Sequence, residues 1–196
     1  MQQDLLPGFA SDSGFPEGLV YRQGFLTPVE EAALRARLAA LELGELTMRG
    51  FVAKRRVAHF GHGYALDARE LSPAPPLPPF LVALRARVAP LAGVAPEALA
   101  MASVLRYPPG AGIGWHRDAP PFGTVVGLSL GSAARFLLRR GGPGGDEREL
   151  LLAPGDAYVL ARAARWGWQH RVPPVRAERY AVTFRTMRGD ARAQAG

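Results

Sequence analysis

Cysteine is absent from this 196-residue chain, which excludes disulfide bonds, thiolate-ligated zinc and a cysteine nucleophile. Lysine is nearly absent too: Lys54 is the only one, so arginine supplies almost all of the positive charge. No apolar run approaches the roughly 20 residues needed to cross a bilayer. The first residues, from Met1 to Asp4, lack the basic start and apolar core of a signal peptide. We therefore expect a cytoplasmic protein with no membrane segment.

The residues that are present describe a soluble globular protein. Hydrophobic residues make up 48% of the chain and charged residues 21%, which is typical of a domain with a real core. The length predicts a single domain over residues 1–196, and we expect a monomer. The net charge of +7 favours a polyanionic partner, of which nucleic acid is the commonest.

Two helices are predicted in the first half of the chain. Thr27, Pro28 and Glu30 form a helix start with a capping box, and the apolar spacing carries this helix through Leu41 to an end before Gly44. A proline-rich connector over residues 73–79 precedes a second helix over about residues 80–91.

The second half changes to short strands separated by turns. These predicted strands cover residues 102–107, 125–130, 135–139, 149–152, 157–160 and 180–187. We therefore predict an α+β fold in which a jelly-roll (double-stranded β-helix) core carries the two N-terminal helices on its outside.

A candidate metal site begins at Trp115-His116-Arg117-Asp118. Residues two apart on one strand point to the same side, so His116 and Asp118 can present an imidazole and a carboxylate to one point. With His170 from a distant segment, two imidazoles and one carboxylate would leave three positions open on an octahedral ion, as in non-haem Fe(II) oxygenases. The alternative is a chance His-x-Asp pair and a structural His170.

Polar residues alternate with apolar ones between Arg179 and Arg185. Alternation places Arg179, Thr183 and Arg185 on one strand face, with aromatic and branched residues on the other. Buried arginines need an anionic partner, and a dicarboxylate co-substrate would supply one through bidentate contacts. The alternative is a pair of solvent-facing arginines on an edge strand.

The segment 47–66 is aromatic, basic and punctuated by glycine. One interpretation is a core strand that ends in a turn. The other is a lid that grips a nucleotide, because aromatic faces and arginines suit an unpaired base and its phosphates. The residues alone favour neither.

Together, His116, Asp118, His170, Arg179 and Arg185 resemble in order and spacing the AlkB family of Fe(II)/2-oxoglutarate dioxygenases, in its short bacterial form. The resemblance is strongest over about residues 100–188, where the segments 105–110, 126–131 and 152–156 also look like family landmarks. It implies a jelly-roll core over about residues 101–188 and a nucleotide-recognition lid over about residues 47–66.

The resemblance also implies residue roles. His116, Asp118 and His170 would hold Fe(II), while 2-oxoglutarate and O2 would be the co-substrates. Arg179 would bind the distal carboxylate of 2-oxoglutarate with help from Tyr107, Arg185 would lie near its C1 end, and Thr183 would line the same pocket. In the lid, base stacking and phosphate contact would fall to Arg56, Phe60 and Tyr64.

Three positions depart from the family pattern. Leu105 and Ala181 stand where many members carry an asparagine that contacts the co-substrate, and Pro120 stands where an AlkB member has an acidic residue near the target base. Base preference therefore does not transfer from the family.

The implied function is oxidative demethylation or hydroxylation of alkylated DNA or RNA bases, in repair or in tRNA modification. A duplex base would have to be flipped out or presented on a single strand. Two alternatives stay open: the same chemistry on protein side chains, and a non-catalytic nucleic-acid-binding module with a vestigial site.

Overall fold

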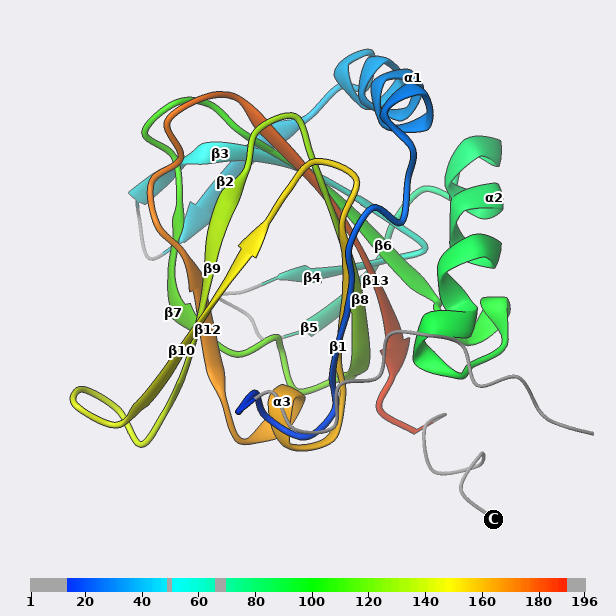
Figure 1. The fold of residues 1–196 in the computed structure, drawn as a ribbon. Coiled ribbons are helices and arrows are strands. Elements are labelled where there is room, and N and C mark those ends of the chain that lie inside the picture. Colours follow the sequence, from blue (N-terminus) through cyan, green and yellow to red (C-terminus); the bar gives the residue numbers. More distant parts are fainter. Residues whose placement is uncertain (1–13, 49–50, 66–69, 190–196) are drawn as a thin grey trace, which may run out of the picture.

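The computed structural model describes residues 14–48, 51–65 and 70–189 (Figure 1). The first half contains β1 (Leu19–Arg22), α1 (Pro28–Ala39), β2 (Gly44–Met48), β3 (Phe51–Phe60), β4 (His62–Ala65), β5 (Glu70–Pro73), α2 (Pro79–Val88) and 3-10 turns at Ala89–Ala92 and Pro96–Ala98. The second half contains β6 (Met101–Tyr107), β7 (Ile113–His116), β8 (Phe122–Leu130), β9 (Ala134–Arg140), β10 (Asp146–Leu152), β11 (Ala157–Leu160), α3 (Arg162–Trp166), β12 (Gln169–Val172) and β13 (Arg179–Met187).

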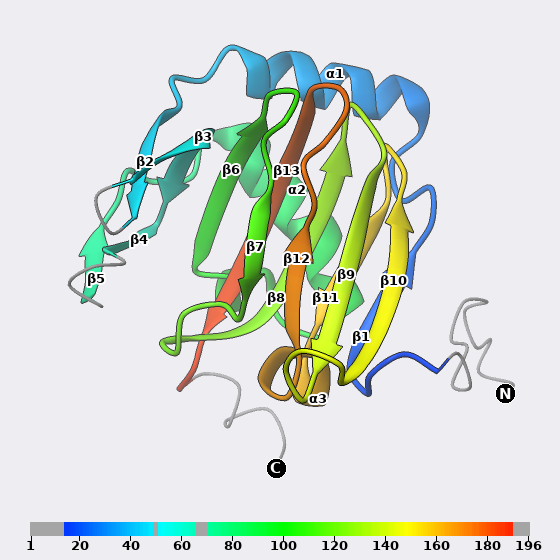
Figure 2. The same ribbon diagram turned by 90° about the vertical axis from the view of Figure 1, so that its left-hand side faces the viewer.

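Two antiparallel sheets face each other and form the predicted jelly roll. The larger sheet has seven strands in the order β1-β11-β8-β13-β6-β3-β2, and the smaller has four in the order β10-β9-β12-β7. Figure 2 shows the four-stranded sheet in front of the larger one, with α1 and α2 behind both. The predicted architecture, a β core with the N-terminal helices outside, is therefore confirmed.

Helix α1 begins as predicted. The Glu30 amide donates to Thr27 Oγ1 at 3.3 Å, and the Thr27 amide donates to Glu30 Oε2 at 2.9 Å, which completes a capping box. The helix ends at Ala39 rather than running through Leu41. No helix in the described part of the chain is long and apolar enough to cross a bilayer.

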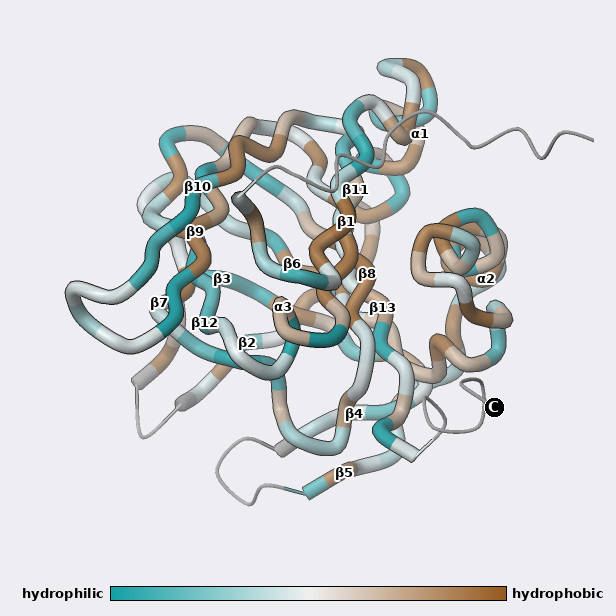
Figure 3. Tube along the Cα trace, turned by 60° about the horizontal axis from the view of Figure 1, so that its bottom comes forward, coloured by the Kyte–Doolittle hydropathy of each residue, from teal (hydrophilic) through white to brown (hydrophobic). Residues whose placement is uncertain are grey.

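Each sheet interface has its own hydrophobic core. One core fills the space between the helices and the seven-stranded sheet and includes Leu38, Leu81 and Phe184. The other lies between the two sheets and includes Phe136 and Leu138. Figure 3 shows hydrophobic residues concentrated in β8 and β9, while β10, at the sheet edge, is hydrophilic over its first four residues and hydrophobic only at its last three. A strand at an edge has one exposed side, so fewer of its residues need to be apolar.

The segment 47–66 is only partly a separate lid. Residues 49, 50 and 66 lie outside the described residues, as do most of residues 1–16. Strand β3 pairs with β6 inside the large sheet, so this part matches the core-strand interpretation. After the turn at Gly61, β4 and β5 form a separate two-stranded sheet.

Candidate active site

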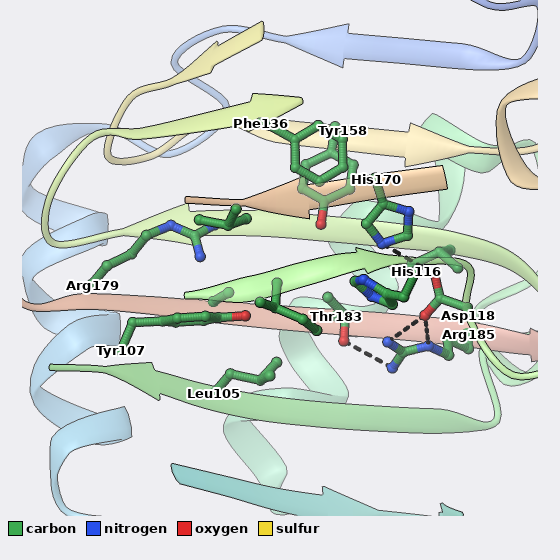
Figure 4. Close-up of a pocket in the computed structure, with 14 residues that line it drawn as sticks. Leu105, Tyr107, His116, Asp118, Phe136, Tyr158, His170, Arg179, Thr183 and Arg185 are labelled. Carbon is green, nitrogen blue, oxygen red and sulfur yellow. Dashed lines mark hydrogen bonds and ion pairs between the residues drawn. The ribbon is translucent and has the colours of Figure 1, made fainter. Parts of the chain in front are cut away.

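A pocket opens between the two sheets (Figure 4). It encloses about 60 Å³, whereas a single water needs roughly 10–15 Å³ on the same measure, so a small organic molecule can enter. Its walls come from both sheets and consist of Leu105, Tyr107, Ile113, His116, Asp118, Val125, Phe136, Tyr158, His170, Val172, Arg179, Ala181, Thr183 and Arg185.

One end of the pocket brings His116, Asp118 and His170 together. His116 and His170 are cross-strand partners of β7 and β12, and their ring centroids lie 4.2 Å apart. His170 Nε2 lies 3.6 Å from Asp118 Oδ2. Strand β7 ends at His116, so Asp118 reaches the pocket from the following loop and not, as expected, from the same strand.

The loop that carries Asp118 is held by Arg165 of α3. This guanidinium is 2% exposed and donates to the carbonyl oxygens of Asp118, Ala119, Phe122 and Gly123 at 3.2, 2.9, 2.8 and 2.8 Å. Four acceptors on one rigid cation fix the path of the loop between β7 and β8.

Burial and nearby charges set the ionisation of this end of the pocket. Burial lowers the pKa of His170 to about 3, with a further contribution from His116, and burial also lowers the pKa of His116. For Asp118, burial alone would raise the pKa, but Arg185 and the two imidazoles together hold it well below its usual value. The site therefore offers two neutral imidazoles and one carboxylate near neutral pH.

This donor set fits a divalent transition metal. Asp118 Oδ2 is buried without a hydrogen-bond partner, which is costly unless a cation or donor approaches it. His116 Nδ1 lies 2.9 Å from the Gly114 carbonyl oxygen, which leaves Nε2 free to coordinate. Among the described residues, no three histidine, aspartate or glutamate side chains are arranged to hold a metal ion as they stand. Asp118 Oδ1 is turned toward Arg185, 2.8 Å from its Nε.

The other end of the pocket contains Arg179, the largest fully buried side chain of the described residues. Its Nε donates to Ser129 Oγ at 3.0 Å, and its guanidinium lies 5.1 Å from the centre of the Tyr107 ring. No ion pair to Arg179 occurs among the residues that the structure describes. A buried cation in this position suits the carboxylate of a bound ligand.

The predicted alternation of β13 is confirmed. Arg179, Ala181, Thr183 and Arg185 line the pocket, while Tyr180, Val182 and Phe184 lie in the core beneath the helices. Besides its pair with Asp118, Arg185 donates to Thr183 Oγ1 at 2.9 Å and to Ser103 Oγ at 3.0 Å. Arg185 is thus held in place beside the carboxylate.

The three predicted lid residues take different positions. Phe60 packs against the core beneath the helices, which favours a structural role. Arg56 pairs with Glu45. Tyr64 lies closer to the site, because its ring meets Phe122 edge-on at 6.0 Å, and Phe122 ends the loop that carries Asp118. The lid as a nucleotide-binding element stays a prediction.

Two features of the site had not been predicted, the packing of Tyr158 and the bracing by Arg165. The Tyr158 ring lies 4.8 Å from the Phe136 ring in a tilted arrangement and lies over Gly127, where a Cβ would come within 2.2 Å of the tyrosine ring. The glycine between two branched or apolar residues of β8 was the available signal. Arg165 left no such signal, because its acceptors are backbone carbonyls.

The jelly roll and its pocket define an oxygenase class, and comparison with known families agrees. Residues 18–189 match the family model of the 2OG-Fe(II) oxygenase superfamily. The chain belongs to this superfamily, whose members are dioxygenases that use Fe(II), 2-oxoglutarate and O2.

Individual relatives are distant. An uncharacterised protein of Acanthamoeba polyphaga mimivirus is 28% identical over 97 residues, which cover 43% of this chain and 46% of that protein. The chain thus spans about half the length of this relative.

Three solved structures share the fold. OsALKBH1 superposes with a TM-score of 0.66 at 19% identity, over 88% of this chain and 98% of the other. An oxidoreductase of the 2OG-Fe(II) oxygenase family from Burkholderia pseudomallei gives 0.60 at 21% identity, over 87% and 86%. A Pseudomonas putida prolyl-4-hydroxylase gives 0.60 at 18% identity, over 87% and 93%.

Proposed function

We propose that this protein is an AlkB-like dioxygenase of the short bacterial type that demethylates or hydroxylates alkylated bases in DNA or RNA. The observation that carries the proposal is the single pocket with two chemically distinct ends. The His116, Asp118 and His170 cluster lies at one end, and the buried Arg179 cation lies at the other.

In this proposal the two imidazoles and Asp118 hold the iron, which when bound supplies the oxidising power. Arg179, with Tyr107 beside it, binds the distal carboxylate of 2-oxoglutarate by charge-assisted hydrogen bonds. Arg185 keeps Asp118 ionised and oriented through its contacts at 2.7 and 2.8 Å. The apolar walls formed by Val125, Phe136 and Val172 restrict water around the reacting groups.

The nucleic-acid part of the proposal is supported by the net charge of +7, which attracts phosphates. It is also supported by the likeness of the fold to OsALKBH1. Leu105 and Ala181 place apolar groups on the pocket wall, where many AlkB members have asparagines. Fewer polar contacts then hold the co-substrate, and the proposal assigns more of its binding to Arg179.

Turnover against a panel of substrates tests this function. Purified protein with Fe(II) and 2-oxoglutarate would be incubated with alkylated DNA and RNA oligonucleotides and with methylated and proline-containing peptides, and the products weighed by mass spectrometry. We expect loss of methyl groups, or gain of oxygen, only on the oligonucleotides, together with succinate.

The Asp118→Ala variant serves as the matched control. It should abolish turnover and weaken Mn(II) binding while the thermal unfolding profile stays cooperative. Turnover confined to peptides would replace the substrate class with protein side chains. Wild-type protein that binds no Mn(II) at all would contradict the metal site and indicate a non-catalytic module.

A further inference from the structure

The motif that carries His116 and Asp118 contains two more residues, Trp115 and Arg117, which the reaction does not use. Trp115 forms a cluster with Arg139 of β9 and Arg171 of β12, named here the arginine patch. Arg117 lies nearby in the sequence, is exposed and donates to the Gly167 carbonyl oxygen at 3.4 Å. Arg171 directly follows His170, whose side chain lines the pocket, so alternation puts Arg171 on the opposite, outer face of the four-stranded sheet. The arginine patch therefore lies on the outer face of β7 and β12, the two strands that carry His116 and His170 on their inner face.

Trp115 organises the patch. The guanidinium of Arg139 lies 4.3 Å from the centre of its ring, and that of Arg171 lies 5.0 Å away. Arg139 also donates to Gln169 Oε1 at 3.0 Å. These contacts hold two long side chains in fixed orientations, so less side-chain entropy is lost when a ligand binds them.

The positive charge of the patch is not neutralised. Among the residues that the structure describes, Arg117, Arg139 and Arg171 form no ion pair. Glu147 is the register partner of Arg139 but does not pair with it. The Nε atoms of Arg139 and Arg171 are buried without any hydrogen-bond partner.

Two other arginines of the same sheet, Arg135 and Arg140, do form ion pairs. Arg135 pairs with Glu149 at 2.7 Å, and Arg140 pairs with Asp146 at 3.0 Å. Both of these pairs bridge β9 and β10, at the opposite end of the sheet from β7. Arg135 and Arg140 are thus neutralised, whereas Arg139 and Arg171 are not, and Arg148 of β10 donates, in the described part of the chain, only to the carbonyl oxygens of Gly14 and Glu147.

We propose that the arginine patch binds backbone phosphates of the nucleic-acid strand that carries the target base. The inference rests on the proposed function and deepens it by adding a second contact region outside the pocket. Guanidinium forks match phosphate oxygens. Arg139 and Arg171 lie together against Trp115 of β7, the edge strand of its sheet, and two neighbouring cations suit a chain of anions better than a single one. Because both guanidiniums lie against Trp115, the patch recognises charge and not base identity.

The salt dependence of binding tests the inference. Affinity for a fluorescent single-stranded oligonucleotide with one alkylated base would be measured from about 50 to 200 mM salt. Each phosphate contact contributes roughly 0.7 to the slope of log affinity against log salt for single strands. Replacing two arginines should lower that slope by about 1.4, which at about 0.1 M salt corresponds to a roughly 25-fold weaker affinity.

The test variant is the double substitution Arg139→Gln with Arg171→Gln. Its matched control, Arg135→Gln with Arg140→Gln, removes the same charge from the same sheet and should leave the slope at the wild-type value. A second test variant, Arg139→Lys with Arg171→Lys, keeps the charge and should restore most of the slope, which separates charge from folding.

Each outcome has a defined meaning. Equal slopes for the glutamine test variant and its control, with wild-type protein that oxidises alkylated oligonucleotides, overturn the arginine patch and leave the proposed function standing. Wild-type protein that turns over peptides and binds no oligonucleotide overturns both. A slope lowered in the glutamine test variant and restored by lysine supports the inference.

Discussion

Replacement of Arg165 by methionine would test how the Asp118 loop is held. Methionine keeps much of the apolar volume of the side chain but removes every donor that contacts the loop. The lost contacts are four hydrogen bonds of 2.8–3.2 Å to backbone carbonyls, and the guanidinium also lies 4.2 Å from the Trp166 ring.

The size of the effect follows from these contacts. One hydrogen bond to a charged group contributes roughly 1.5–3 kcal/mol. Four bonds do not sum fully, because they share one guanidinium whose burial is itself costly. We therefore expect the free energy of unfolding to fall by about 3 kcal/mol, and the Tm by about 6–12 °C for a chain of this length.

Two assays test the two expected effects of the substitution, on stability and on metal affinity. Calorimetry gives the loss of stability, and titration with Mn(II) gives the affinity of the site that Asp118 helps to form. We expect Mn(II) to bind at least about tenfold more weakly, which corresponds to about 1.4 kcal/mol of disordering at the loop.

Arg162→Met is the control, because Arg162 lies on the same helix, its side chain is 75% exposed, and among the described residues it pairs only with Glu17, whose side chain is 68% exposed. Such surface pairs contribute about 0–1 kcal/mol. If the two methionine variants showed the same Tm and the same Mn(II) affinity, the bracing role of Arg165 would be refuted.

Three further predictions concern one residue of the pocket and two residues outside it. Arg179→Gln should raise the KM for 2-oxoglutarate roughly 30- to 150-fold, the equivalent of about 2–3 kcal/mol for a charged contact; an unchanged KM would place the co-substrate elsewhere. Gly127→Ala should lower the free energy of unfolding in urea by about 1–3 kcal/mol, because the new methyl group would lie 2.2 Å from the Tyr158 ring. Gly114→Ala is the control and should leave the free energy of unfolding nearly unchanged, because nothing lies within 4 Å of the added methyl group. Burial lowers the pKa of His59 to about 4 in the folded protein, whereas the same imidazole in the unfolded chain titrates near about 6.5. As the pH drops from about 6.5 to 4, the unfolded chain therefore binds a proton that the folded protein does not, and the free energy of unfolding falls. His59→Gln should make that fall smaller, and an identical pH profile would contradict this assignment.

The jelly roll could be predicted because its strands alternate and its helices have clear start signals. Capping residues such as Thr27 act through neighbours in the sequence, so the start of α1 is visible without the structure. Helix α3 was missed for a physical reason. It is five residues long, has no side-chain cap and starts at Arg162 with a φ of +46°, a conformation that non-glycine residues seldom adopt.

The parts of the site that depend on the type of side chain could be predicted from the sequence. The inward face of β13 followed from alternation. The approach of His170 to His116 followed from the resemblance in ligand order to the AlkB family and not from alternation. The supports of the site were not predictable in this way. Arg165 contacts carbonyls that every residue possesses, and the space for Tyr158 depends on the absence of a side chain at Gly127.

The position of β7 at the edge of its sheet affects how the protein loses and regains a bound metal ion. Strand β12 is paired on both sides, whereas, among the strands that the structure describes, β7 is paired only with β12. Local fraying should therefore begin at β7 and carry His116 away from His170, while Arg165 still holds the Asp118 loop. We expect amide hydrogens of β7 to exchange sooner than those of β12, with departure of a bound ion limited by that same opening.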